Sequence, residues 1–180
     1  MTKGKPSFVR RLSEAHARLR NAIAGLDEAT LDAEPIVGDW TIKDVLGHVV
    51  SWNDEFRCDI QAILRGEHPG YERQIDARKN FDEANQQWVS QKRSWTWPAV
   101  SADLDRDYRE TLDLVLALQP EDYRRRGVTP WKLAARSKPA EPTRADTDSV
   151  LTLLTYHWRH MNEHARALER WRAKRSKGIP

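Results

Sequence analysis

Apolar residues recur at steps of three and four in five separate stretches of this 180-residue chain. Such steps return side chains to one face of an α-helix, so each stretch predicts an amphipathic helix with one buried stripe. No stretch alternates apolar and polar residues as a half-buried strand does, and the predicted fold class is therefore all-α. The expected helices cover residues 7–26, 41–65, 81–93, 98–119 and 148–172.

The residues between these stretches support the predicted boundaries. Thr41 followed by Asp44 is close to a capping box, with Asp in place of the usual Glu or Gln, and the helix that begins there stops near Gly66. Residues 27–39 contain a Pro and a Gly and read as a connector. Residues 121–147 are the least regular part, and their Gly and Pro residues predict a long loop before the last helix.

Composition indicates a single domain over residues 1–180. Charged residues make up 32% of the chain, yet the net charge of +3 is too small to indicate nucleic-acid binding. Cys58 is the only cysteine, which excludes an intrachain disulfide and favours a reducing compartment. Residues 1–7 lack the apolar run of a signal peptide, and no stretch approaches the roughly 20 apolar residues of a membrane span. We therefore expect a cytoplasmic protein with no membrane segment.

The last predicted helix carries three of the six histidines within eight residues, at His157, His160 and His164. Side chains four residues apart lie one above the other on a helix, so His160 and His164 can point at one site, with His157 one turn earlier on nearly the same stripe. A His-x-x-x-His pair on a helix is a common source of two imidazole ligands for one divalent metal. The pair therefore indicates a metal site that needs a third ligand.

His48 is the candidate for that ligand. It lies two turns into the helix predicted over 41–65, between Val45 and Trp52 on the same side. Three neutral imidazoles bind Zn²⁺ or Ni²⁺ and leave a coordination position for water or a substrate. The residues alone leave two interpretations open: a three-histidine metal site, or neutral histidines hydrogen-bonded within a core.

Several motifs resemble those of a known family. Residues 40–48 (WTIKDVLGH) and 157–164 (HWRHMNEH) are similar to the second-helix and last-helix histidine motifs of the DinB/YfiT-like superfamily. Residues 81–85 and 94–97 are similar to its ClbS/DfsB-like branch. The resemblance spans most of the chain but rests on short motifs, and the loop after Pro120 and the tryptophan-rich segment depart from the simplest family pattern.

The resemblance implies a four-helix bundle that forms a homodimer. Together with the helices predicted above, the expected fold is an up-down-down-up bundle with an extra short helix and a long loop before the last helix. The resemblance also implies a divalent metal on His48, His160 and His164, and it makes His157 a neighbour that supports the ligands or acts as a catalytic acid or base. Characterised members are metal-dependent transferases, isomerases or hydrolases, several of which use a low-molecular-weight thiol. The implied function is activation of water or a thiol against a small electrophilic substrate.

Two further hypotheses stay open. The ClbS/DfsB-like branch implies a self-protection protein that binds or hydrolyses a reactive genotoxic small molecule, with DNA association as an option and without a need for metal. A scaffold whose histidines are core polar residues is the third reading. Glu163 and Asp44 fall off the histidine face, so we expect surface and capping roles for them. Trp52 and Trp158 are candidates for a pocket wall or for core packing.

Overall fold

The computed structural model describes residues 4–33, 35–67, 69, 81–129 and 143–177. Helices make up most of these residues, and four of them are long. Their bounds are α1 Gly4–Ile23, α2 Glu28–Ala33, α3 Ile42–Arg65, α4 Phe81–Lys92, α5 Trp97–Ala117 and α7 Val150–Ser176, with short 3₁₀ turns η1 at Asp122–Arg124 and η2 at Arg144–Asp146.

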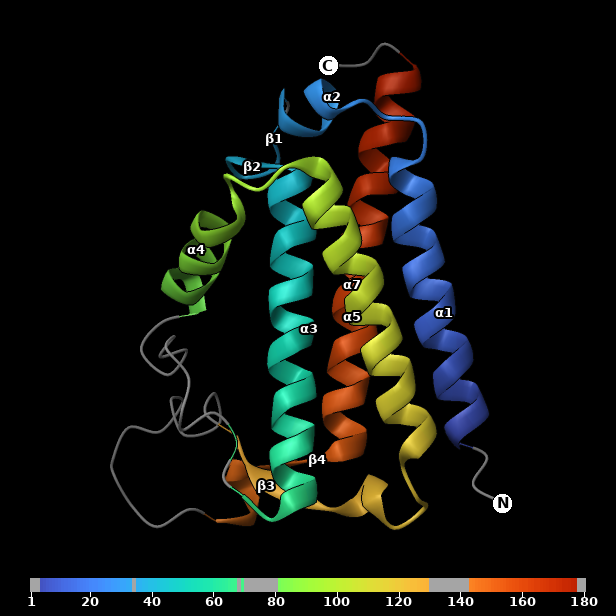
Figure 1. The fold of residues 1–180 in the computed structure, drawn as a ribbon, viewed down its shortest axis with the longest axis vertical. Helices are drawn as coiled ribbons and strands as arrows, with labels where there is room; N and C mark the ends of the chain where they lie inside the picture. The colour runs from blue at the N-terminus through green and yellow to red at the C-terminus, as the bar shows by residue number, and fades with distance from the viewer. Residues whose placement is uncertain (1–3, 34, 68, 70–80, 130–142, 178–180) are drawn as a thin grey trace.

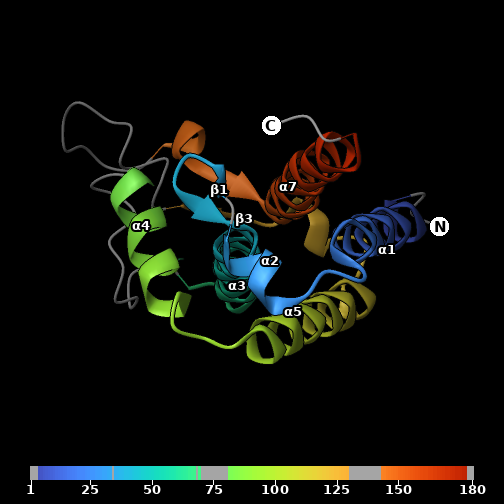
Figure 2. The same ribbon diagram turned by 90° about the horizontal axis from the view of Figure 1, so that it is seen from above.

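The four long helices α1, α3, α5 and α7 form a bundle in which α1 and α7 run one way and α3 and α5 run the other (Figure 1). Viewed from above, α1 and α3 each pack between α5 and α7 (Figure 2). The predicted all-α, up-down-down-up four-helix bundle is confirmed. The arrangement places α3 directly beside α7, which are the two helices that carry the candidate metal ligands.

The predicted apolar stripes form the bundle core. Leu19 of α1, Leu46 of α3, Leu104 of α5 and Leu168 of α7 are all fully buried in one cluster. Burying a leucine side chain stabilises the folded state by about 1.5–3 kcal/mol relative to leaving it in water, so these stripes hold the helices together. A second cluster fills the other half of the bundle around Phe56, Ile60, Val115 and Leu153.

Helix α3 begins and ends as its sequence predicts. The Thr41 side chain accepts a hydrogen bond from the Asp44 backbone N–H, and the Asp44 carboxylate accepts one from the Thr41 N–H. At the other end Gly66 adopts the left-handed conformation, with a φ of 78°, and its N–H reaches the carbonyls of Ala62 and Ile63. Glycine adopts this conformation without the steric penalty of a side chain, so the helix stops there.

Two short antiparallel strand pairs, which the sequence did not predict, occur in the predicted connectors. Strand β1, Pro35–Val37, pairs with β2, Trp40–Thr41, and strand β3, Arg126–Val128, pairs with β4, Thr147–Ser149. Strands of two or three residues are too short to show an alternating pattern. Helix α2 likewise occupies part of the predicted 27–39 connector, and residues 130–142 of the predicted loop lie outside the described residues.

Strand β3 shows why Gly127 stands in this segment. A Cβ atom added there would lie 2.5 Å from Cγ1 of Ile63, near the end of α3. A contact that short forces atoms to move, so glycine allows the strand to lie against the helix. The residue read as a loop signal is in fact a close-packing position.

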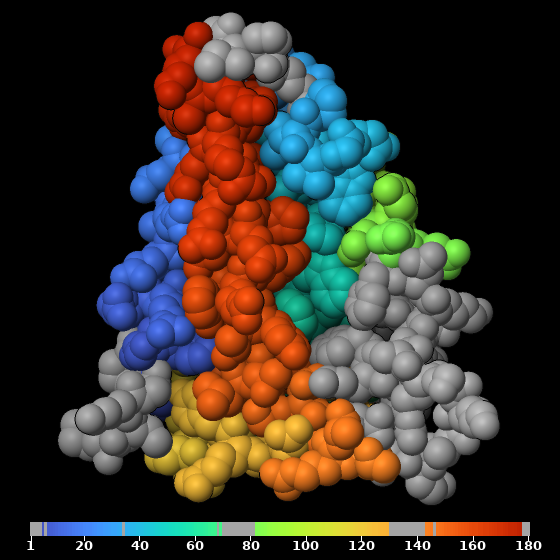
Figure 3. Space-filling view, turned by 180° about the vertical axis from the view of Figure 1, so that it is seen from behind, coloured from blue at the N-terminus to red at the C-terminus, as the bar shows by residue number. Residues whose placement is uncertain are grey.

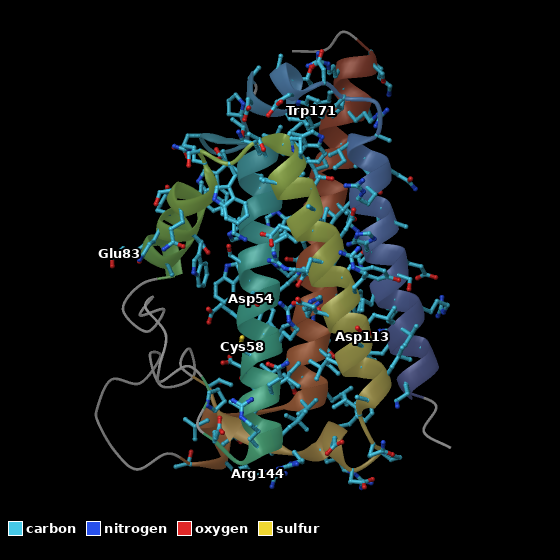
Figure 4. All side chains as sticks on the ribbon, in the orientation of Figure 1. Asp54, Cys58, Glu83, Asp113, Arg144 and Trp171 are labelled. Carbon is cyan, nitrogen blue, oxygen red and sulfur yellow. The ribbon has the colours of Figure 1, made fainter. Side chains whose placement is uncertain are left out.

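Helix α4 is the predicted extra short helix, and it lies beside α3 outside the four-helix bundle (Figure 2). The Trp52 indole N–H of α3 donates to Asn85 of α4 at 2.7 Å. Lys92 near the end of α4 pairs with the buried Asp103 of α5 at 2.6 Å. Glu83 points outward from the far side of α4, away from the bundle (Figure 4).

The ends of the long helices shift from the predicted positions. Helix α1 begins at Gly4 and ends at Ile23, and α7 continues to Ser176. The last turn of α7 contains Lys174 and Arg175, whose positive charges interact favourably with the carbonyl end of a helix. Among the described residues, no helix combines the length and apolarity that a bilayer crossing requires.

Candidate metal centre

His48 of α3 and His160 and His164 of α7 meet where these two helices pack side by side. On α7 the histidines alternate with the fully buried Met161 and Ala165. His48 is buried, with 4% of its surface exposed, while His160 and His164 are partly exposed. Seen from behind, α7 runs the length of the molecule with part of α3 visible between it and α4 (Figure 3).

The three imidazoles point their Nε2 atoms at one another. The Nε2 of His160 lies 3.1 Å from the Nε2 of His48 and 3.1 Å from the Nε2 of His164. One ligand nitrogen from each ring falls within a group whose members are all within 4.8 Å of one another. Tetrahedral zinc with Zn–N bonds of about 2.0–2.1 Å separates its nitrogen ligands by about 3.3–3.4 Å, so the cluster has the size of a metal site.

Hydrogen bonding alone satisfies this cluster only in part. A neutral imidazole Nε2 carries either a proton or a lone pair, so it makes one hydrogen bond, as donor or as acceptor. His160 Nε2 has two close nitrogen neighbours, and only one of these contacts can be a normal hydrogen bond between neutral rings. A cation that accepts all three lone pairs satisfies every Nε2 at once, so the donor set fits a divalent metal.

Burial keeps these imidazoles in the form that binds metal. Desolvation is the main cause that lowers the pKa of His48 to about 3 and that of His164 to about 4. The pKa of His160 is lowered well below 6.5 by desolvation and by its histidine neighbours. All three rings are therefore neutral at pH 7, and protons do not compete with a metal for their lone pairs.

Two of the Nδ1 nitrogens of the site lack hydrogen-bond partners among the described residues. The Nδ1 atoms of His48 and His160 are buried and have no hydrogen-bond partner among the described residues. Metal-bound histidines usually donate this N–H to a carbonyl or carboxylate, which orients the ring and makes it a stronger ligand. Packing must hold these two rings instead.

Two tryptophans supply that packing. The Trp40 ring lies 4.8 Å from the ring of His48, and the Trp52 ring lies 6.3 Å from that of His160. Trp52 thus lines the site, and Trp40 does so although the sequence did not single it out. Trp158 instead lies under the guanidinium of Arg11, 5.0 Å from its ring, in the contact between α1 and α7.

His157 occupies a different position from the other α7 histidines. Its exposed fraction is 2%, and its Nε2 lies 3.2 Å from the hydroxyl of Thr111 on α5. Burial, with a further contribution from the charge of Arg57, lowers the pKa of His157 to about 3. The structure therefore brings His48, His160 and His164 together and turns His157 toward α5.

The polar groups around His157 were missed by the sequence reading. Asp107 and Thr111 stand four residues apart in α5, both fully or almost fully buried, and Asp107 binds Arg57 and Asn53 of α3. The available signal was the recurrence of polar residues at steps of four, Asp103, Asp107 and Thr111, on the face of α5 that also carries Val100, Leu104 and Val115. Burial raises the pKa of Asp107 to about 6, against the opposing effects of Asn53 and Arg57.

The carboxylates near the histidines on the two helices have the roles expected of them. Asp44 caps α3 and pairs with Arg93 at 2.9 Å, and Glu163 is exposed on α7. Neither belongs to the metal-size cluster found among the described residues. The remaining described histidine, His16, lies 3.1 Å from Asp105 in the contact between α1 and α5.

Comparison with known proteins gives this arrangement a family. A sequence model described as the DinB superfamily matches residues 11–168. The chain belongs to the DinB superfamily. The matched region includes all three histidines of the cluster, all of α3 and α5, and most of α1 and α7.

Solved structures share the DinB-like fold at low sequence identity. A Streptococcus pneumoniae protein aligns with a TM-score of 0.74 and 12% identity over 96% of this chain and 92% of its own. DfsB, described as a sibling lethal factor precursor, aligns at 0.70 and 13% over all of both chains. YfiT of Bacillus subtilis aligns at 0.64 and 19% over 100% of this chain and 91% of its own. No curated protein matches the sequence.

Proposed function

We propose that this DinB-superfamily protein is a metal-dependent enzyme that acts on a small electrophilic substrate. His48, His160 and His164 hold a divalent ion, Zn²⁺ or Ni²⁺. The observation that carries the proposal is the convergence of three neutral Nε2 atoms at 3.1 Å contacts, which hydrogen bonds between neutral rings satisfy only in part. In support, YfiT is described as a probable metal-dependent hydrolase with an unusual four-helix bundle topology.

The reaction classes follow from the ligand set. A divalent ion on three neutral imidazoles supplies Lewis acidity that lowers the pKa of water or of a thiol. Water as the nucleophile makes the protein a hydrolase, and a low-molecular-weight thiol makes it a transferase. Trp40 and Trp52 against the histidine rings give the site apolar walls, which suit a small substrate with an apolar body. A cytoplasmic homodimer completes the proposal.

The acid–base role of His157 stays a prediction. Its Nε2 faces Thr111, and its pKa of about 3 keeps it unprotonated at neutral pH. A neutral imidazole with so low a pKa is a weak base, and its one remaining N–H is too weakly acidic to serve as a general acid. Its position between α5 and α7 favours a role in holding the site.

The direct test is the metal content of purified protein after reconstitution with Zn²⁺ or Ni²⁺. We expect about one ion per chain in the wild type, as for a three-histidine site, and loss of that ion in His48→Ala and His160→Ala. His16→Ala is the matched control, because His16 lies between α1 and α5 and pairs with Asp105. Stoichiometric metal in His160→Ala, or none in the reconstituted wild type, contradicts the proposal.

A metal-free wild type would turn attention to the protection hypothesis. DfsB shares the fold, and that hypothesis requires binding or hydrolysis of a reactive small molecule without metal. A panel of small electrophiles, assayed with and without thiol and with and without chelator, separates the three outcomes. Chelator-sensitive turnover without thiol indicates a hydrolase, chelator-sensitive turnover that requires thiol indicates a transferase, and chelator-insensitive binding or turnover supports protection.

A further inference from the structure

A network of buried polar side chains lies next to the metal centre and joins three helices of the bundle. Asn53 and Arg57 belong to α3, Asp107 and Thr111 to α5, and His157 to α7. Their exposed fractions are 0%, 7%, 0%, 2% and 2% in that order. Polar groups this deeply buried are retained in a core only when their hydrogen bonds are made, so the contacts among them constrain where the helices lie.

The contacts run in one direction across the bundle. Asn53 Nδ2 and Arg57 Nη1 donate to the two carboxylate oxygens of Asp107, at 2.8 and 2.6 Å. Arg57 Nη1 also lies 3.4 Å from Thr111 Oγ1, and Thr111 Oγ1 lies 3.2 Å from His157 Nε2. Arg57 can only donate, so the Thr111 hydroxyl accepts from it. The same hydroxyl has both a proton and a second lone pair for the contact with the neutral His157 ring, and the tautomer of that ring sets which of the two donates.

At Arg57 the network extends to partly exposed carboxylates. Arg57 Nη2 pairs with Asp54 at 2.6 Å and with Glu110 at 2.7 Å, and both of these carboxylates are about half exposed. Asp54 lies on α3 near the middle of the helix (Figure 4). The guanidinium is thus fixed by carboxylates from both α3 and α5, and it holds Thr111 in a defined position.

The network lies within two helical turns of the metal ligands. Asn53 follows His48 by five residues on α3, an axial rise of about 7.5 Å, and His157 precedes His160 by three residues on α7, a rise of about 4.5 Å. The metal ligands come from these same two helices. Sliding or rotation of α7 against α3 therefore changes both the Thr111–His157 contact and the meeting of the three Nε2 atoms.

We propose that Thr111 is a positioning residue for the metal centre: its hydrogen bond to His157 sets the rotation of α7 that brings His160 and His164 to His48. The inference rests on the proposed metal-dependent function. Leucine, methionine and alanine contacts between helices tolerate small shifts, because dispersion contacts have little directionality, whereas a buried hydrogen bond is lost when its partners move apart. Packing brings α7 to α3, and the Thr111 bond selects its angle.

Thr111→Val tests this role because it keeps the shape of the side chain and removes the hydroxyl. Thr111→Ser keeps the hydroxyl. Thr155→Val is the matched control, since Thr155 is a partly exposed residue of α7 whose hydroxyl, among the described residues, donates to the Leu151 carbonyl of its own helix. Zn²⁺ affinity is measured by chelator competition, and the Co²⁺-substituted protein is examined by visible absorption. Circular dichroism of the metal-free proteins shows which variants are folded.

We expect Thr111→Val to weaken Zn²⁺ binding by about 10-fold, the lower end of the range seen when direct partners of metal ligands are removed, because Thr111 acts on the ligands through His157. We also expect it to change the Co²⁺ absorption bands, which report ligand geometry. Thr111→Ser and Thr155→Val should retain wild-type affinity and spectra. If Thr111→Val does not fold, Thr111→Cys replaces it, and its weaker hydrogen bond predicts an affinity between those of the serine variant and a fully disrupted site.

The outcomes separate this inference from the proposed function. Wild-type affinity and spectrum in folded Thr111→Val, or in Thr111→Cys when that variant replaces it, overturn the positioning role and leave the metal site standing. Absence of metal binding in the wild type overturns the proposed function itself. Equal weakening in Thr111→Val and Thr155→Val also overturns the inference, because the effect would then come from loss of any hydroxyl.

Discussion

Two groups of buried polar side chains stand next to each other in this bundle, and they differ in how well the protein itself satisfies them. In the buried polar network around Arg57 and Asp107, the Asp107 carboxylate accepts hydrogen bonds from two donors. The Arg57 guanidinium pairs with three carboxylates, including that of Asp107. The network's one buried atom without a partner among the described residues is Asn53 Oδ1. In the histidine cluster, three nitrogens crowd together and hydrogen bonds account for only part of the contact.

The difference distinguishes polar side chains that stabilise the fold from polar side chains that are available to bind a ligand. A buried polar group that finds its partners within the protein contributes to a defined fold. A set of lone pairs directed at one point, without donors to meet them, is a binding site for a cation. Substitutions in the network should therefore change stability, and substitutions in the cluster should change metal binding.

The largest expected effect is on stability, from Arg57→Ala. Removing one partner of a buried ion pair leaves the other charge uncompensated and typically costs about 3–5 kcal/mol. Asp107→Asn should cost less, because Arg57 keeps Asp54 and Glu110 as partners. Denaturant unfolding of the metal-free proteins checks both values. A loss below about 1 kcal/mol in Arg57→Ala, a value typical of exposed pairs, would show that the network is not a structural unit.

The next effect is the response to metal. Zn²⁺ at about 100 times its Kd should raise the unfolding free energy of the wild type by about 2.7 kcal/mol, since the ion binds only the folded chain. His160→Ala should show no such rise. Its metal-free stability should stay within about 1 kcal/mol of the wild type, because the substitution relieves a crowded contact and a buried unpartnered nitrogen. Thermal unfolding with and without Zn²⁺ measures both quantities.

A third prediction uses pH to separate the contributions of two members of the network, His157 and Asp107. The pKa of His157 falls from 6.5 to about 3 on folding, so the unfolded chain binds protons first. Burial of neutral His157 therefore costs no unfolding free energy above pH 6.5. As the pH falls from 6.5 toward 3, the unfolded chain gains a proton that the folded chain does not, and the unfolding free energy decreases. Asp107 acts in the opposite direction, since its pKa rises to about 6 and folding is favoured as pH falls from 6 to 3.8.

His157→Gln removes the first of these contributions and leaves an oxygen that can accept from Thr111. Between pH 7 and pH 5 the variant should therefore lose about 2 kcal/mol less stability than the wild type, at about 1.4 kcal/mol per pH unit below 6.5. Urea unfolding of the metal-free proteins at the two pH values gives the difference. Equal losses in the two proteins would mean that His157 is not buried in its neutral form.

The smallest expected effect concerns the attachment of α4 beside the site. Asn85→Ala leaves the Trp52 ring in place near His160 and removes the 2.7 Å hydrogen bond that its indole N–H donates to Asn85. The loss of one hydrogen bond should lower stability by about 1 kcal/mol. Metal affinity, measured by chelator competition, should remain unchanged. Weaker metal binding by this variant would show that α4 also supports the histidine cluster. Stability and metal binding would then not be controlled by separate sets of side chains.

Local features of the fold were predictable from the sequence. The Thr41–Asp44 capping box and the stop at Gly66 depend on residues within a few positions of one another. The same holds for the placement of His160 and His164 on one face of α7. The β3–β4 pair was not predicted, because Arg126 and its partner Ser149 lie far apart in the chain and three residues are too few to show a pattern.

By itself, the sequence determined the helices, the faces they bury, and a histidine pair aimed at one side of α7, because helical periodicity and capping act over a few residues. Tertiary structure decided that α3 packs beside α7 and so brings His48 to that pair. It also decided that His157 faces Thr111 and that Asp107 meets Arg57. These contacts join residues 46 to 112 positions apart, and only the packing of the whole bundle sets such distances.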